Sequence, residues 1–208
     1  MKRKLEELKN KNLDELTSLL PSRILAHSKR VAICCAQLAG YASDVISLPR
    51  FENSADLAAV AYFGGLCHDI GKLLIEEDDK EDYVNHPQLG LKLLLQNSVE
   101  LFEAINQRQM VLEMTRYHHE RADGKGFPYG LNNRNIPLCA AICTVADRLD
   151  NLIYGQENKS LSPQELLQYF LNQVGQCYTS AAVSCFELAL PTLNEYYVEW
   201  NKEKSEQL

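Results

Sequence analysis

The stretch Leu66-Cys67-His68-Asp69-Ile70-Gly71-Lys72 decides how the rest of the chain is interpreted. It follows the apolar run 57–63, which predicts a buried helix over 54–69. We expect Gly71 to break this helix and turn the backbone, which leaves an imidazole and a carboxylate side by side at a helix end. Such a pair is half of a metal site, because imidazole nitrogen suits transition metals and a carboxylate can bridge two ions. Taken alone, the pair is better explained as a capping histidine and an aspartate that starts a turn.

The composition limits the classes of protein to which the chain can belong. Its 208 residues, 46% of them hydrophobic, are enough for one domain with a core. The net charge of −7 argues against DNA and other broad nucleic-acid binding, which needs a basic face. No apolar stretch approaches the ~20 residues that span a bilayer, and the basic residues 1–4 lead into no apolar region, so we expect neither a membrane span nor a signal peptide. Seven cysteines without a CxxC pair indicate reduced core thiols in a cytoplasmic protein, although a metal site at Cys139 and Cys143 stays open.

Apolar residues recur at helical spacing along the chain, and no convincing strand is found. We therefore predict a single all-α domain over 1–208, with an N-terminal helical extension (1–20), a metal-binding core (21–158) and C-terminal helices (159–208). The terminal helices are amphipathic, and we expect them to pack within the protomer or against a second copy or signalling partner. The expected helices cover 2–20 (as one helix or two), 22–42, 54–69, 99–119, 180–190 and 191–204, and further helices begin near 86, 136 and 162.

The positions of the five histidines form a pattern. Histidines that are merely hydrogen-bonded in a core would have no reason to cluster in this way. Four of the five lie at or near the ends of expected core helices: the set is His27, His68, His86, His118 and His119. Adjacent helical residues point ~100° apart, so His118 and His119 could serve two different ions. With Asp69 and Asp147, the inventory is sufficient for two octahedral ions whose shells water or substrate completes.

The motifs around these residues resemble the HD-GYP subfamily of HD-domain metal-dependent phosphohydrolases. They are His27-Ser28-x-x-Val31-Ala32, His68-Asp69-Ile70-Gly71-Lys72, His86-Pro87-x-x-Gly90, His118-His119-Glu120-x-x-Asp123-Gly124-x-Gly126-Phe127-Pro128-x-Gly130-Leu131 and Val145-Ala146-Asp147. The resemblance runs from about Ser22 to Phe186, and its long central motif is specific. It implies an HD-domain helical bundle with additional N- and C-terminal helices. It also implies hydrolysis of a cyclic dinucleotide, the bacterial second messenger cyclic di-GMP, by a hydroxide activated at a metal centre.

The resemblance implies a role for individual residues as well. The expected ligands of two divalent ions are His27, His68, Asp69, His86, His118, His119 and Asp147. Iron or manganese come first, with nickel, zinc or magnesium as alternatives. Asp69 as the bridging carboxylate and Lys72 are the expected catalytic residues, since Lys72 matches a family lysine that faces the scissile phosphate; it could also protonate the leaving oxygen if its pKa is shifted. The candidate substrate contacts are Lys72, Arg121, Asp123, Lys125, Phe127, Arg148 and Lys159.

The chain departs from the subfamily pattern at three places. Phe127 replaces the signature tyrosine, Arg23 stands where members with three metals carry a glutamate, and Gln156-Glu157-Asn158-Lys159 replaces an Arg-Pro-Tyr-Arg-like segment. Because arginine cannot ligate a metal, we predict a dinuclear site. The other two changes affect the grip on the substrate. Together with the amphipathic terminal helices, they keep a non-catalytic signalling or interaction domain open as an alternative. Two further alternatives are a di-iron oxygenase, which HD-type scaffolds can also host, and a phosphohydrolase of ordinary nucleotides.

Overall fold

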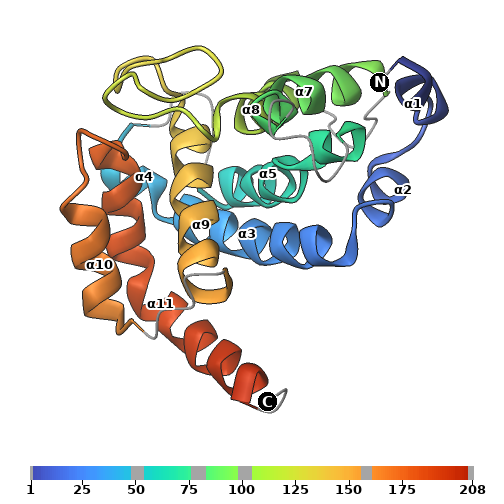
Figure 1. Cartoon of the computed structure of the whole chain (residues 1–208). Coiled ribbons are helices and arrows are strands. Elements are labelled where there is room, and N and C mark those ends of the chain that lie inside the picture. The colour runs from blue at the N-terminus through green and yellow to red at the C-terminus, as the bar shows by residue number, and fades with distance from the viewer. Residues whose placement is uncertain (1, 48–53, 76–82, 98–104, 156–160, 206–208) are drawn as a thin grey trace.

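The computed structural model describes residues 2–47, 54–75, 83–97, 105–155 and 161–205 (Figure 1). These residues form ten α-helices and one 3-10 helix and contain no strand, so the predicted all-α class is confirmed. In chain order the helices are α1 (Lys2–Glu7), α2 (Leu13–Ser18), α3 (Ser22–Gly40), α4 (Ala42–Val45), α5 (Ser54–Cys67), η1 (Ile70–Leu74), α7 (His86–Gln96), α8 (Ile105–Tyr117), α9 (Leu138–Tyr154), α10 (Pro163–Leu171) and α11 (Ser180–Ser205).

Helices α3, α5 and α9 form the centre of the bundle. The most extensive packing joins α5 to α3, and α5 also contacts α8 and α9. A Cβ at Gly65 on α5 would lie 2.7 Å from the Cα of Ala32 on α3, so this glycine lets the two backbones approach. The buried positions on α5 include Leu57, Val60 and Ala61. An apolar circumference is what a helix surrounded by others requires.

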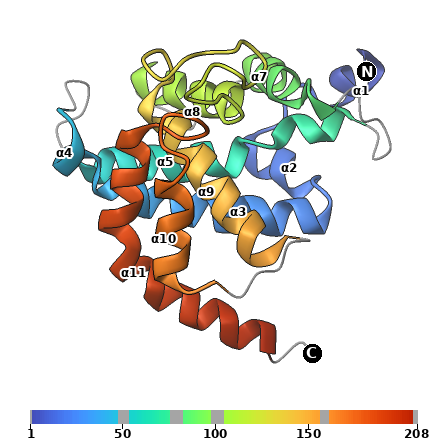
Figure 2. The same cartoon turned by 60° about the vertical axis from the view of Figure 1, so that its left-hand side comes forward.

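The C-terminal helices α10 and α11 lie next to each other beside α9 (Figure 2). Helix α11 packs against α3 and α9, and α10 packs against α11. Because α11 is continuous through Pro191, the prediction of two helices, 180–190 and 191–204, is wrong. A proline inside a helix removes one backbone hydrogen bond, but Leu193 is only 4% exposed and keeps the next turn on the core.

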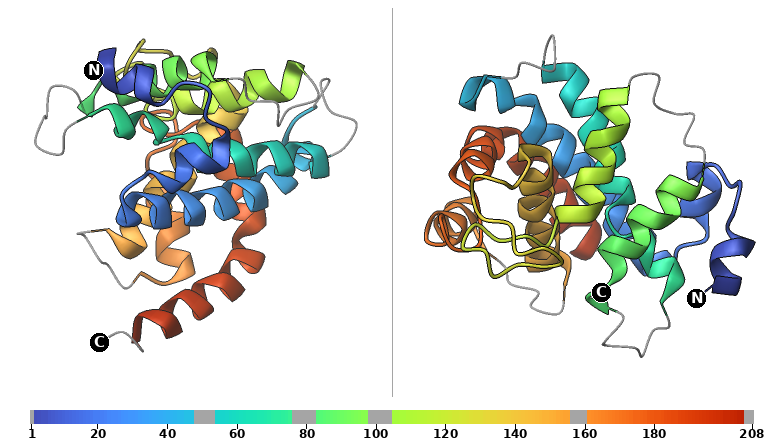
Figure 3. Two further views of the ribbon diagram at one scale, coloured as in Figure 1. Left: turned by 90° about the vertical axis from the view of Figure 1, so that its right-hand side faces the viewer. Right: turned by 90° about the horizontal axis from the view of Figure 1, so that it is seen from above.

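The N-terminal extension consists of two short helices, which is one of the two predicted forms. Leu13 and Leu16 on α2 are buried against the core. The backbone N–H of Lys11 donates to the side-chain oxygen of Asn97 over 2.9 Å, and the Asn97 side chain is itself fully buried. Figure 3 shows both helices at the edge of the bundle beside α7. The extension is therefore attached to the bundle by a packed apolar face and by a specific hydrogen bond.

The cysteines behave as core side chains. All seven thiols are free, and each is buried except Cys177, which is half-buried. Within the described ranges, no cysteine belongs to a group of side chains that could hold a metal, so a site at Cys139 and Cys143 finds no support. No helix in this part of the chain is both long and apolar enough to cross a membrane. The division of the chain at residues 20 and 158 stays a prediction.

Candidate metal centre

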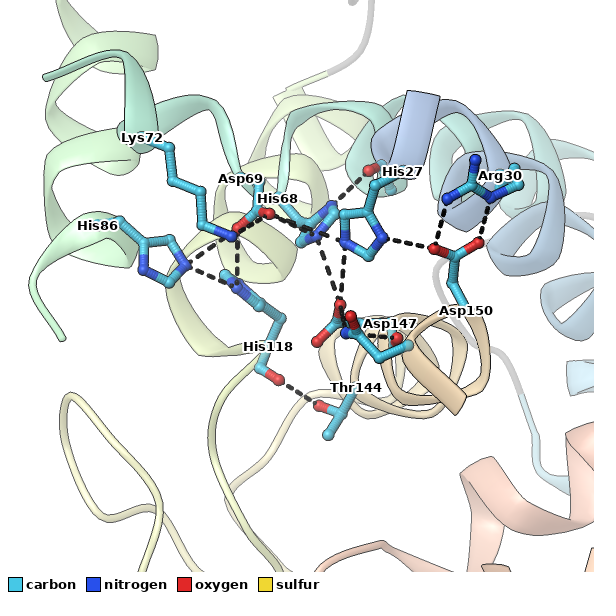
Figure 4. A network of polar contacts seen from close by, with 12 residues as sticks. His27, Arg30, His68, Asp69, Lys72, His86, His118, Thr144, Asp147 and Asp150 are labelled. Carbon is cyan, nitrogen blue, oxygen red and sulfur yellow. Dashed lines mark hydrogen bonds and ion pairs between the residues drawn. The ribbon is translucent and has the colours of Figure 1, made fainter. Parts of the chain in front are cut away.

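Side chains from five parts of the chain meet in the middle of the bundle (Figure 4). They are His27 on α3, His68 and Asp69 between α5 and η1, His86 at the start of α7, His118 and His119 after α8, and Asp147 on α9. Two groups can each hold a metal ion, because the ligand atoms within a group lie within 4.8 Å of one another. The first group is His27, His68 and Asp69, and the second is His86, His118 and His119. The structure thus brings together all seven residues of the predicted ligand set.

Asp69 lies between the two groups and is 2% exposed. Its Oδ1 is 3.1 Å from Nε2 of His86 in the second group, and its Oδ2 is 3.4 Å from Nε2 of His68 in the first group. Asp147 adds a carboxylate to the first group, with Oδ1 3.1 Å from Nε2 of His27. One oxygen of Asp69 toward each group is the arrangement that a bridging carboxylate needs.

Backbone carbonyls orient three of the imidazoles. Nδ1 of His68, His86 and His118 each donates to the carbonyl three residues earlier, over 2.7, 2.6 and 3.0 Å. Because a carbonyl only accepts, the proton of each neutral ring is on Nδ1 and its Nε2 carries a free lone pair. Hydrogen bonds of this kind to the outer nitrogen are the usual support of metal-ligating histidines.

The lone pairs at the centre require a positive partner. Nε2 of His86 and Nε2 of His118 lie 3.1 Å apart, although both are acceptors in these tautomers. Nε2 of His68 and of His119 are buried and have no hydrogen-bond partner. Burial and the neighbouring imidazoles hold the pKa of His118 well below its usual range, so that a proton is a poor partner. The donor set therefore fits divalent metal ions.

Asp150 orients the ring of His27, as the backbone carbonyls orient three other rings. The sequence motifs did not reveal this role of Asp150. Its buried carboxylate accepts the N–H of His27 Nδ1 over 2.7 Å and is held by Arg30 through contacts of 2.5 and 2.9 Å. Burial alone would lower the pKa of His27, but Asp147 and Asp150 outweigh burial and raise it to about 9. A signal did exist, since Asp150 follows Asp147, and Arg30 follows His27, by three residues on one helix face.

Lys72 projects from η1 to the same centre. Its Nζ lies 2.5 Å from Oδ2 of Asp69. Burial would lower the pKa of Lys72, but the Asp69 carboxylate, with Tyr83 and Asp147, outweighs burial and raises it. The side chain is therefore an ammonium ion at neutral pH. This geometry fits a fixed positive charge better than a proton donor, which would need a lowered pKa.

Gly71 holds η1 against the start of α7. Helix α5 ends at Cys67, so the expectation that Gly71 ends it is wrong. A Cβ at Gly71 would lie 1.9 Å from the carbonyl oxygen of His86 and 2.5 Å from the backbone nitrogen of Gly90. The glycine is needed because two backbones approach here, and this approach positions His86 beside Asp69.

The loop after His119 is built around Glu120. The Glu120 carboxylate is 1% exposed and accepts the backbone N–H groups of Tyr129 and Leu131, each over 2.8 Å. Inside this loop the ring of Phe127 packs against the ring of His119 at a tilt of 31°, with centroids 4.6 Å apart. Phe127 thus contacts a candidate metal ligand, and its predicted role as a substrate contact stays a prediction.

A cavity of about 1090 Å³ opens over the centre and reaches the N-terminal helices. Its lining includes Lys72 and four residues of the predicted ligand set: His27, Asp69, His119 and Asp147. The cavity is at the upper end of the size that ligand pockets have, so the centre is accessible to a sizeable molecule.

Five of the expected substrate contacts do not line this cavity: Arg121, Asp123, Lys125, Phe127 and Arg148. Nη2 of Arg121 pairs with Asp123 over 2.7 Å. Nε of Arg148 donates to the hydroxyl of Tyr169 on α10 over 2.7 Å. Lys159, with the segment 156–159, lies outside the described residues.

Comparison with known proteins finds relatives that share this core. A family model of the HD domain matches residues 24–152. A cyclic di-GMP phosphodiesterase of Thermotoga maritima is 26% identical over 156 residues, which cover 69% of this chain and 40% of the relative. The 3'3'-cGAMP-specific phosphodiesterase 1 of Vibrio cholerae is 27% identical over 175 residues, which cover 82% of this chain and 38% of the relative. The cyclic di-GMP phosphodiesterase PA4108 of Pseudomonas aeruginosa is 31% identical over 142 residues, which cover 64% of this chain and 32% of the relative. The chain therefore spans two-fifths or less of the length of these relatives.

The fold has a counterpart among solved structures. The crystal structure of the HD domain of the L. monocytogenes phosphodiesterase PgpH matches with a TM-score of 0.52 and 15% sequence identity, covering 88% of this chain and 98% of that one. This likeness confirms the predicted HD-domain fold, and the distant homologues confirm the resemblance to HD-GYP-type phosphodiesterases. Since the family model matches more than half of its 208 residues, the chain belongs to the HD domain family.

Proposed function

We propose that this chain is a metal-dependent phosphodiesterase that hydrolyses a cyclic dinucleotide, cyclic di-GMP, at a dinuclear centre. The observation that carries the proposal is the position of Asp69, which directs one oxygen toward each of two histidine groups. The relatives that are phosphodiesterases of cyclic di-GMP and of 3'3'-cGAMP support the substrate class.

The ligand residues divide between the two ions. His27, His68 and Asp147 would hold one ion, His86, His118 and His119 the other, and Asp69 both. Two such ions supply Lewis acidity that lowers the pKa of water and neutralises the charge of the phosphodiester. With this imidazole-rich donor set, iron or manganese is our first expectation, and nickel, zinc and magnesium are the alternatives.

The substrate would approach from the side of His27, Asp147 and Lys72. Their side chains are 15%, 16% and 19% exposed, whereas those of His86 and His118 are fully buried. Lys72 stands at this open side as an ammonium ion and would stabilise the phosphoryl oxygens as their charge increases. The buried rings have no such contact and serve as ligands alone.

The test combines metal analysis with an assay of the product. Protein purified without oxygen should contain about two metal ions per chain by elemental analysis, given the two ligand groups. It should convert cyclic di-GMP to a linear product, and 3'3'-cGAMP should be assayed beside it. Removal of the metal with a chelator should abolish hydrolysis, and return of iron or manganese should restore it. Metal-loaded protein that cleaves no phosphodiester would refute the proposal.

A non-catalytic signalling domain is the second candidate. Arg121 and Arg148, both expected on the substrate, are engaged by other side chains, and Phe127 lacks the hydroxyl of the signature tyrosine. Protein that binds cyclic di-GMP without releasing product would favour this candidate. Oxygen uptake with a small organic substrate would indicate the di-iron oxygenase, and preference for mononucleotides would indicate the ordinary phosphohydrolase. A cytoplasmic location and a homodimer or signalling partner through the terminal helices stay predictions.

A further inference from the structure

The cavity over the metal centre has one wall that the matched family segment does not supply. The family match begins at residue 24, and α1, α2 and the first two residues of α3 come before it. The cavity lining from this part of the chain is Lys4, Glu7, Leu8, Leu19, Pro21 and Arg23. The N-terminal helices therefore face the same space as the metal ligands.

This wall is built into the fold. Leu8 is 8% exposed, and Leu16 is fully buried. The side-chain N–H of Gln96 on α7 donates to the carbonyl of Leu5 over 2.9 Å. Together with the hydrogen bond from Lys11 to Asn97, this contact attaches α1 and α2 to the end of α7. The backbone of α1 and α2 is thus held beside the cavity.

The cations of the cavity fall into two kinds. Lys72 and Arg30 are occupied by aspartates at the centre. Lys4 and Arg23 have no carboxylate partner in the part of the chain that the structure describes, and the nearest acceptor of Lys4 is a backbone carbonyl at 3.5 Å. Two cations without a carboxylate partner at one cavity make this wall locally positive in a chain whose net charge is −7.

The acidic side chain of the N-terminal wall does not oppose this assignment. Glu7 is the acid on the N-terminal wall, and its carboxylate pairs with Arg3 over 3.1 Å. Leu19 and Tyr83 also line the cavity, although 49% and 47% of their surface is exposed. Exposed apolar faces beside a cationic surface suit a ligand that has flat bases as well as phosphates.

We propose that the N-terminal wall completes the substrate site, and that Lys4 and Arg23 bind the second phosphate of a cyclic dinucleotide while the first phosphate is at the metal centre. The inference rests on the function proposed above. A cyclic dinucleotide carries two phosphodiester anions in one ring, so both must enter the same cavity. A guanidinium and an ammonium are the protein groups best suited to a phosphate.

The test compares a substrate that has two phosphates with one that has a single phosphate. The substrates are cyclic di-GMP and bis(p-nitrophenyl) phosphate. The variants are Arg23→Ala and Lys4→Ala, and the control is Lys9→Ala, which removes a cation paired with Glu6 that does not line the cavity. Metal content and thermal unfolding should be measured for each variant, to establish that the centre and the fold are retained.

We expect KM for cyclic di-GMP to rise about tenfold in each of the two variants, because a hydrogen bond between charged groups is lost. The value of kcat should be kept, and kcat/KM for the one-phosphate diester should be unchanged. Arg23→Lys should recover part of the loss, and Lys9→Ala should behave like the unmodified chain.

Three results would overturn the inference. An unchanged KM for cyclic di-GMP would refute it and leave the proposed function intact. An equal loss on both substrates would place the cations at the reacting phosphate instead. If the unmodified chain cleaves neither substrate, the proposed function fails, and calorimetric binding of cyclic di-GMP then decides: weaker binding by Arg23→Ala supports the anion site, and equal or absent binding refutes it.

Discussion

The replacement Gly71→Ala tests how the backbone positions the second histidine group. One methyl group would lie 1.9 Å from the carbonyl oxygen of His86, whereas ordinary contacts begin at 3.4 Å. Helix α7 and η1 would have to separate by roughly 1.5 Å. Because the obstacle is backbone on both sides, we expect the free energy of unfolding to fall by ~3 kcal/mol, the upper end of the overpacking range. Metal–ligand distances tolerate changes of only about 0.2 Å, so His86 should no longer serve as a ligand.

The assay is urea unfolding of the metal-free protein together with elemental analysis of the metal-loaded protein. Gly40→Ala is the matched control, since a Cβ there meets nothing within 4 Å at the end of α3. It should leave the metal content unchanged and stabilise the helix by up to ~1 kcal/mol. We expect Gly71→Ala to lose stability and at least one of the two ions. A Gly71→Ala protein with the control's unfolding midpoint and full metal content would refute the reasoning about this contact.

Further predictions concern the centre itself. Asp69→Ala should lose both ions and all hydrolysis, because one carboxylate faces both groups; elemental analysis that still finds one bound ion would contradict this. Lys72→Ala should keep both ions while kcat falls by a factor on the order of 10² to 10³, and an unchanged kcat would remove its assigned role. Asp150→Asn should weaken metal binding by about 10- to 100-fold in a titration, because His27 loses its anionic support. The metal-free protein should be most stable near pH 6.5. Below that pH the unfolded chain binds more protons, since the folded pKa of His119 is about 4, which corresponds to a loss of up to about 3 kcal/mol by pH 4. Above that pH the folded chain binds more protons than the unfolded chain, because the folded pKa of His27 is about 9. The stabilising contribution of His27 is therefore lost as the pH rises toward 9. Urea unfolding at several pH values checks both slopes, and a stability that only rises with pH would contradict the account of His27.

The helices and the metal centre were accessible from the sequence because their signals are local. Helical periodicity placed α3, α5 and α9, and a proline at the second position marked the start of α7. Pro191 shows the limit of such local rules, since packing of α11 on the core outweighs the lost hydrogen bond. Gly71 shows another limit, because its role depends on the backbone of His86, which is far along the chain.

The partners of surface cations could not be predicted in the same way. Arg148 is engaged by Tyr169, whose helix packs on α11, and Arg121 is engaged by Asp123 within its own loop. Nothing in the spacing of these residues distinguishes them from Arg23, which does line the cavity. Long-range packing decides which partner a flexible cationic side chain contacts. The pattern of apolar residues in the sequence does not predict that partner.

The centre and the substrate wall therefore differ in how the sequence encodes them. For His68, His86 and His118, the carbonyl three residues earlier orients the ring, so a short motif carries the orientation of the ligand with it. The N-terminal wall has no such unit, because the place of α1 and α2 depends on contacts with distant residues, among them the hydrogen bonds from Lys11 to Asn97 and from Gln96 to Leu5. A motif can consequently identify a metal-binding HD core while leaving the anion-binding part of the cavity undetermined. For this chain the second part comes from residues that precede the family match, which is why substrate choice has to be tested at Lys4 and Arg23 rather than at the metal ligands.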